Sequence, residues 1–265
     1  MKLTRNVLAL IFSLSLLLAL PASAVTDGEL DGEGHPAVGI LIFDAGGGPA
    51  WRCSGTLLSP TVMLTAGHCT DGAEAGRVWF DSDEATVRAK GYPIGGSGAI
   101  EFSAIATHPL FPTASFVFND VGVVILSEPV VLDDDQYGVL PELNELDALK
   151  TRRGKQNQMF RAVGYGLQRI NPVFVQADLN RHVAYPNLIQ INVPGFTGDF
   201  SLLLTNNHST GGTCFGDSGG PNFIGNSMVV GGVTSFGING NCAGTGGVFR
   251  MDRANALDFV NMWLQ

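Results

Sequence analysis

Short apolar segments that recur between glycine and proline turns constrain this chain most strongly. Glycine supplies 35 of its 265 residues, and charged residues supply 15%, below the roughly 25% of typical soluble domains. Apolar residues reach 45%, which is enough for a sizeable core. Strand-length segments at this spacing predict an all-β sandwich or barrel rather than alternating β and α units. These segments are residues 37–43, 78–80, 121–126, 160–163, 188–193, 228–233 and 247–249.

One stretch near the C-terminus, residues 252–264, has the periodicity of a helix instead. Apolar residues recur there at spacings of three and four, which places them on one helical face. Asp252 precedes the first of them and is the expected N-cap. The apolar positions are Ala256, Phe259, Val260, Trp263 and Leu264.

The first 24 residues have the pattern of a secretory signal peptide. Lys2 and Arg5 form a basic start, residues 8–20 form an apolar run, and Pro-Ala-Ser-Ala follows as a break with small residues. The alternative is a membrane anchor, but thirteen residues fall short of the ~20 that span a bilayer. We therefore expect secretion, a mature chain that starts at Val25, and no membrane contact after cleavage.

The charge balance limits the partners of the mature chain. The formal net charge is −9, and removal of Lys2 and Arg5 with the signal peptide takes away two positive charges and leaves −11. This acidity argues against nucleic acid or an anionic membrane surface as the main partner. Nothing in the sequence requires an assembly larger than a monomer.

Four cysteines are expected to form disulfides in an exported chain, and sequence alone leaves three pairings open. A zinc site is not expected, because no two cysteines have the short spacing that zinc ligands require. The cysteines are Cys53, Cys69, Cys214 and Cys242.

Three segments contain residue types that suit nucleophilic catalysis. His68 lies in Leu-Thr-Ala-Gly-His-Cys, Asp120 directly precedes an apolar run, and Ser218 lies in Gly-Asp-Ser-Gly-Gly-Pro. Taken singly, each has a simpler interpretation: a structural histidine, a turn aspartate and a tight glycine turn. Together, in this order, they point to a catalytic serine with its base.

The three segments resemble the motifs of the chymotrypsin-like (trypsin-fold) serine peptidases. Gly164-Tyr165-Gly166 and Ser235-Phe236-Gly237 are similar to two further family motifs, so the resemblance extends over nearly the whole mature chain. It implies two six-stranded Greek-key β-barrels with a C-terminal α-helix. The barrels would span roughly residues 25–140 and 141–265.

The resemblance also implies the roles of the site residues. Ser218 would attack an internal peptide bond of a polypeptide and form an acyl-enzyme, with His68 as its base and Asp120 orienting the imidazole. Backbone N–H groups of Gly216 and Ser218 would form the oxyanion hole. Ser235 would support the buried Asp120. This chemistry needs no cofactor and no metal.

Further expectations follow from the family pattern. The disulfides would be Cys53–Cys69 and Cys214–Cys242. The free amino group of Val25 would pair with Asp217, so that signal peptidase itself would generate the active N-terminus.

The specificity pocket would be formed by Gly212, Thr213, Gly237 and Gly247. Gly212 stands where trypsin-type members keep an acid, so a Lys or Arg side chain would find no counter-ion there. Three glycines would leave the slot open, which favours a large apolar or aromatic residue before the scissile bond (the P1 residue).

Two alternatives compete with the peptidase. An inactive homologue that serves as a binding module usually lacks one of the three residues, and all three are present. A secreted esterase with a G-x-S-x-G elbow would belong to an α/β pattern with serine first and histidine last, unlike the order found here. Protein inhibitors are possible further partners.

Overall fold

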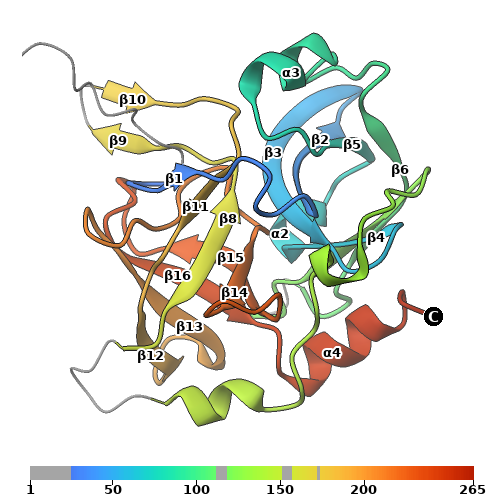
Figure 1. Cartoon of the computed structure of the whole chain (residues 1–265). Helices are drawn as coiled ribbons and strands as arrows, with labels where there is room; N and C mark the ends of the chain where they lie inside the picture. Colours follow the sequence, from blue (N-terminus) through green and yellow to red (C-terminus); the bar gives the residue numbers. More distant parts are fainter. Residues whose placement is uncertain (1–24, 112–117, 151–156, 172–173) are drawn as a thin grey trace, which may run out of the picture.

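The computed structural model describes residues 25–111, 118–150, 157–171 and 174–265. The predicted signal peptide, residues 1–24, lies outside the described residues. Two sets of antiparallel strands lie side by side, with the first half of the chain in one and the second half in the other (Figure 1). None of the described helices is both long and apolar enough to cross a membrane.

The first half forms a closed six-stranded barrel. Its strands follow the order β2-β3-β4-β7-β6-β5, and every neighbouring pair is antiparallel. Two glycines with positive φ, Gly46 and Gly47, make the β2–β3 hairpin turn. The strands are β2 (Val38–Ala45), β3 (Gly48–Leu57), β4 (Val62–Thr65), β5 (Ala75–Trp79), β6 (Ile100–Thr107) and β7 (Gly122–Leu126).

The second half, joined by the short strand β1 from the first half, forms an eight-stranded sheet in the order β1-β11-β8-β14-β15-β16-β13-β12. β11 and β12, near its two ends, are consecutive in the chain and only three residues apart, so one bent segment joins both ends of the sheet. Pro186 lies at this bend, where it has no N–H to donate to a ladder. The strands are β1 (Glu29–Leu30), β8 (Phe160–Gly164), β11 (His182–Ala184), β12 (Leu188–Val193), β13 (Gly198–Asn206), β14 (Pro221–Ile224), β15 (Val230–Gly237) and β16 (Gly244–Arg250).

These two sheets confirm the predicted all-β fold with two barrels. The expected six strands of the second half become eight because the bent segment counts twice and β1 adds to the edge. The boundary near residue 140 stays a prediction. Smaller elements decorate the barrels: α2 (Gly67–Thr70), α3 (Glu84–Ala89), the β9–β10 hairpin (Arg169–Asn171, Phe174–Gln176) and two 3-10 turns (Asp134–Gln136, Glu145–Leu149).

The C-terminal helix α4 (Ala254–Asn261) is present but shorter than predicted, and its N-cap is Arg253 rather than Asp252. The carboxylate of Asp252 is already committed, since it accepts hydrogen bonds from the guanidinium of Arg250 and the N–H of Leu146. The charged guanidinium, together with this backbone N–H, is a better partner for the carboxylate than a helix end.

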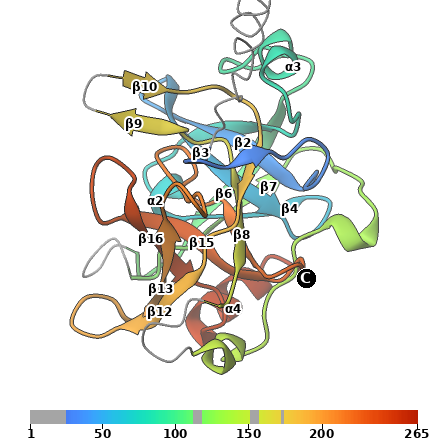
Figure 2. The same ribbon diagram turned by 60° about the vertical axis from the view of Figure 1, so that its left-hand side comes forward.

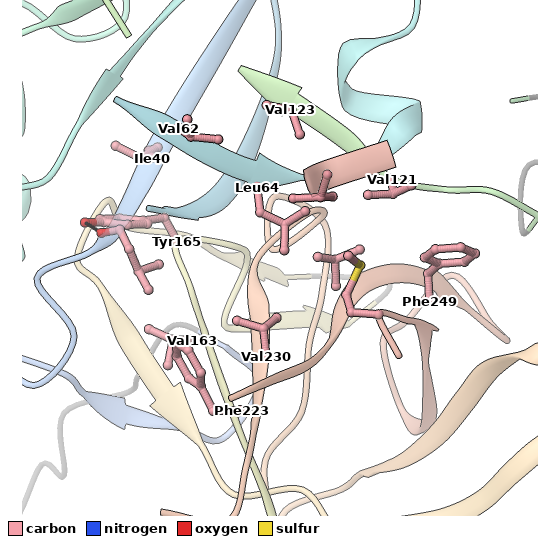
Figure 3. Close-up of a cluster of buried hydrophobic side chains, with 14 of the residues drawn as sticks. Ile40, Val62, Leu64, Val121, Val123, Val163, Tyr165, Phe223, Val230 and Phe249 are labelled. Atoms are coloured by element: carbon pink, nitrogen blue, oxygen red, sulfur yellow. Dashed lines mark hydrogen bonds between the residues drawn. The ribbon is translucent and has the colours of Figure 1, made fainter. Parts of the chain in front are cut away.

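A shared hydrophobic core lies between the two halves (Figure 3). Ile40 and Leu64 of the first barrel belong to the same buried cluster as Val163, Phe223 and Phe249 of the second. Because both sheets bury side chains in this cluster, the halves form one body with a continuous junction.

Candidate active site

His68 lies at the junction of the two halves, on the short helix α2 that follows β4 (Figure 2). Gly67 lets this turn lie close to the segment that leads into β7 (Gly122–Leu126). A Cβ at Gly67 would lie only 3.0 Å from the backbone nitrogen of Val121. The adjacent Cys69 is bridged to Cys53 on β3. A disulfide and a tight backbone contact therefore hold the histidine from both sides.

Asp120 lies just before β7 and is fully buried. Its carboxylate accepts a hydrogen bond from Nδ1 of His68 at 2.9 Å and a second from the backbone N–H of His68 at 2.8 Å. The hydroxyl of Ser235 on β15 donates a third at 2.5 Å. Three donors satisfy this buried charge and fix the imidazole with Nδ1 turned inward. The other ring nitrogen, Nε2, lies on the opposite edge of the imidazole and takes no part in these hydrogen bonds.

Ser218 lies in the turn that precedes β14, half-exposed at the surface of the site. The backbone carbonyl of Ser218 accepts the N–H of Ser54 at 2.8 Å, which ties the turn to β3 of the other half. Ser218 and the half-buried His68 line the same cavity. No hydrogen bond between their side chains is formed within the described residues, a looseness common before substrate binds.

The turn around Ser218 has a backbone conformation that depends on Gly216. Gly216 has φ +100°, a conformation that only glycine adopts without strain. The carbonyl of Phe215 accepts the N–H of Leu167 at 2.9 Å, and the carbonyl of Gly216 accepts the hydroxyl of Ser54 at 2.9 Å. Across the described chain, the N–H groups of Gly216 and Ser218 have no hydrogen-bond acceptor. This pair of donors is available to an oxyanion.

Asp217 points away from the cleft into the protein and is fully buried. Burial raises its pKa from 3.8 to about 7, although the N–H groups of Cys214 and Gly166 and the charge of Arg52 act in the opposite direction. The donors lie 2.8 Å and 2.7 Å from the carboxylate. The segment that begins at Val25 is also buried, and Thr26 pairs with Gly212.

A cavity of about 560 Å³ opens beside Ser218. Thr213 and Gly237 border it as expected, and a Cβ at Gly237 would meet only one atom, at 3.4 Å. Its lining, as far as the structure describes it, contains no Asp, Glu, Lys or Arg. The lining residues are His68, Asn206, Thr213, Cys214, Phe215, Ser218, Thr234, Ser235, Phe236, Gly237, Ile238, Asn239, Gly240, Cys242 and Thr245.

Gly212 and Gly247 do not border this cavity. A Cβ at Gly212 would lie 2.3 Å from Cγ of Asn206, and one at Gly247 would lie 2.3 Å from the ring of Phe236. The space expected beside these two glycines is therefore filled by side chains from neighbouring strands. Asn206 takes the place at the base of the pocket.

Both polar groups of Asn206 are engaged. Its Oδ1 accepts the hydroxyl of Thr26, and its Nδ2 donates to the carbonyl of Thr213 at 2.7 Å. The pocket base is thus neutral and held in place by the N-terminal segment.

The structure contains both disulfides implied by the family resemblance, Cys53–Cys69 and Cys214–Cys242. The first explains why Cys53, His68 and Cys69, whose potential ligand atoms lie within 4.8 Å of one another, do not offer a metal site. Both sulfurs are consumed in the bridge and have no thiolate to donate.

Sequence reasoning missed three residues that shape the site. Leu167 directly follows the Gly-Tyr-Gly motif, but nothing in that motif predicts that its N–H binds the carbonyl of Phe215. Ser54 follows Cys53 on a strand that the pattern did not predict. Asn206 ends another unpredicted strand, and no local signal distinguishes it.

Comparisons with known proteins agree with this geometry. The family model Trypsin matches residues 33–258. Chymotrypsin-C of Bos taurus is 28% identical over 225 residues, which cover 81% of this chain and 80% of the relative. Brachyurin of Leptuca pugilator is 31% identical over 202 residues, which cover 72% of this chain and 77% of the relative. A solved structure of HL collagenase has the same fold, with a TM-score of 0.70 at 20% identity over 91% of this chain and 98% of that one.

The fold and the matched family define a serine peptidase of two β-barrels. This chain belongs to the trypsin family and is a chymotrypsin-like serine endopeptidase, a hydrolase that acts on polypeptides.

Proposed function

We propose that the chain is an exported endopeptidase that hydrolyses internal peptide bonds through an acyl-enzyme on Ser218. The observation that carries the proposal is that Asp120 holds His68 through Nδ1, and that His68 and Ser218 line one cavity. Export is supported by the basic and apolar pattern of residues 1–24 and by two disulfides.

We assign each step of the proposed reaction to a group of this chain. The Ser218 hydroxyl oxygen attacks the scissile carbonyl carbon while its proton passes to Nε2 of His68. Asp120 stabilises the resulting imidazolium through Nδ1. The oxyanion accepts hydrogen bonds from the N–H groups of Gly216 and Ser218. One such donor stabilises the transition state by roughly 3–4 kcal/mol.

Collapse of the tetrahedral intermediate breaks the C–N bond, and His68 returns the proton to the departing amine. An ester on Ser218 remains. Water then attacks this ester, gives a proton to His68, and the serine oxygen leaves with that proton. The net change is addition of one water across one peptide bond.

We infer a preference for large apolar or aromatic P1 residues. The cavity is roomy, Phe215, Phe236 and Ile238 contribute apolar surface, and its base is the neutral Asn206. A Lys or Arg side chain would lose its hydration there without gaining a carboxylate, which is unfavourable.

We also propose that signal peptidase produces the active form directly. A free amino group at Val25 would provide the cation that the buried Asp217 lacks, and Thr26 is already seated against Gly212 and Asn206. The mature protein acts as a monomer in this proposal and remains open to protein inhibitors at its cleft.

Intact-mass spectrometry before and after diisopropyl fluorophosphate tests the proposal. We expect one phosphoryl adduct per chain and none in Ser218→Ala, with an untreated mass that corresponds to a start at Val25. Ser227→Ala, a hydroxyl at the surface of another turn, is the matched control and should still gain the adduct. A folded chain starting at Val25 that gains no adduct would contradict an activated serine.

A further inference from the structure

Arg52 is a cation without a partner at the edge of the proposed catalytic site. It lies on β3, immediately before Cys53, and is half-buried. Its guanidinium forms no hydrogen bond and no ion pair anywhere in the described chain. The other described arginines and lysines each have at least one: Arg77, Arg88, Lys90, Lys150, Arg161, Arg169, Arg181, Arg250 and Arg253.

The position of Arg52 is defined by the oxyanion turn. A Cβ built on Gly216 would lie 2.9 Å from both Nε and Nη2 of Arg52, so the guanidinium packs against the backbone of this glycine. The charges of Arg52 and Asp217 attract each other, but they form no ion pair, because that carboxylate is turned to the N–H groups of Gly166 and Cys214. Arg52 therefore has donors available next to the reacting carbonyl.

Arg52 is not among the residues that line the specificity cavity beside Ser218. The acyl part of a substrate fills that cavity. The leaving part lies on the other side of the scissile bond and so outside that cavity, as the guanidinium of Arg52 does. A cation there meets the residues that follow the scissile bond.

We propose that Arg52 selects substrates that have a carboxylate one or two residues after the scissile bond (P1′ or P2′). This inference rests on the proposed function of the same site. A guanidinium recognises a carboxylate with two parallel hydrogen bonds, which makes it more selective than a simple positive charge. In a chain of strongly negative net charge, one unpaired arginine also offsets the repulsion of an acidic substrate.

The test uses internally quenched peptides with Phe before the scissile bond and amidated ends. Glu, Gln or Lys is placed at the first or the second position after the bond. We expect kcat/KM for Glu to exceed that for Gln about three- to tenfold at one of the two positions, and Lys to be worst. The excess should shrink as salt rises. A shorter peptide with a free C-terminal carboxylate at that position distinguishes a chain end from an acidic side chain.

Variants assign the effect to Arg52. Arg52→Gln should bring the Glu:Gln ratio to about one, and Arg52→Lys should retain part of the preference because its charge remains. Arg88→Gln, which removes the same charge from the exposed helix α3, should leave the ratio unchanged. An equal ratio in the wild type, or a preference that survives in Arg52→Gln, would overturn the inference.

Failure of the proposed function gives a different result. If no peptide is cleaved, the same peptides are titrated into Ser218→Ala and their dissociation constants compared. Tighter binding of the Glu peptide that is lost in the double variant with Arg52→Gln would support the carboxylate site by itself. Equal dissociation constants would exclude it.

Discussion

Among single residues, the site depends on buried polar side chains whose hydrogen bonds are all formed within the protein. Asp120 has three donors, so His68 has one orientation. Asn206 is held by Thr26 and Thr213, so the pocket base has one shape. Such satisfied buried groups give the constellation its rigidity, since moving any of them would leave a polar atom without a partner.

The commitment of Asn206 predicts how the pocket can be redesigned. Gly212→Asp alone should lower kcat/KM for a Phe substrate at least about tenfold without producing cleavage after Arg, because the new Cβ would collide with the pinned Asn206. The double variant with Asn206→Ala frees that space and should gain measurable cleavage after Arg and Lys. A peptide-library cleavage profile of the wild type and both variants checks this, and Arg cleavage by the single variant would contradict it.

At the scale of elements, the turn from Gly216 to Pro221 is shaped by the strands on which it rests. Ser54 of β3 binds the carbonyls of both Gly216 and Ser218, and Thr65 of β4 lies directly beneath Gly219. The nucleophile belongs to the second half of the chain, but the first half holds its backbone in place.

This support makes Gly219 sensitive to substitution. Gly219 has φ +78°, and a Cβ there would lie 2.0 Å from Oγ1 of Thr65 and 2.6 Å from the carbonyl oxygen of Ser54. We expect Gly219→Ala to lower the free energy of unfolding by about 3 kcal/mol or more, measured by urea denaturation in the Ser218→Ala background. Gly225→Ala is the matched control: its φ is +54° with no atom within 4 Å, so only about 1 kcal/mol should be lost. Equal losses would show that backbone conformation, rather than the contact, dominates.

At the scale of the whole molecule, each end of the described chain packs on the half to which it does not belong (Figure 1). β1 extends the sheet of the second half, and Thr26 pairs with Gly212. In return, Phe259 of α4 packs against His108 of the first half at 5.1 Å between ring centroids.

Arg181 closes the junction between the halves. It is fully buried, pairs with Asp31, and donates to the carbonyls of Val38 and Phe80 of the first half. Burial raises the pKa of the neighbouring Tyr165 to about 12, so its hydroxyl stays neutral and donates to Val38 as well. The relative position of His68 and Ser218 depends on this junction.

We expect the stability of the uncleaved chain to depend on pH, and we expect signal cleavage to remove most of this dependence. With Val25 still in a peptide bond, Asp217 has a folded pKa of about 7 against 3.8 unfolded, so the folded state binds the proton more tightly. This proton binding stabilises the fold fully below pH 4, and the stabilisation, on the order of 4 kcal/mol, is lost as pH rises through 7. A chain that starts at Val25 should show a much smaller loss, because the amino group favours the charged carboxylate.

Urea denaturation at pH 5 and pH 8 measures this difference, with Ser218→Ala in both chains to prevent self-digestion. Asp217→Asn in the uncleaved chain should abolish the extra loss of stability. Equal pH dependence in the cleaved and uncleaved chains would contradict an ion pair between Val25 and Asp217.

The fold class, the family and the endopeptidase activity could all be predicted from the amino-acid sequence, and these predictions are confirmed. They were accessible because their causes are local: glycines at 216 and 219 where only glycine fits the backbone, apolar runs of strand length, and three short motifs. Predicted strands at 188–193 and 160–163 match β12 and β8 closely for the same reason.

The surroundings of those motifs could not be predicted from the sequence and became known from the folded chain. β3 and β6 escaped prediction because one face of each is polar, so their pattern shows no continuous apolar run. Asn206 and Arg52 lie near the site but belong to strands that are distant from Ser218 in the sequence. Asp252 binds Arg250 and therefore does not cap the helix. Contacts of this kind depend on how two sheets close and pack together, and side chains compete for partners that no local pattern reveals.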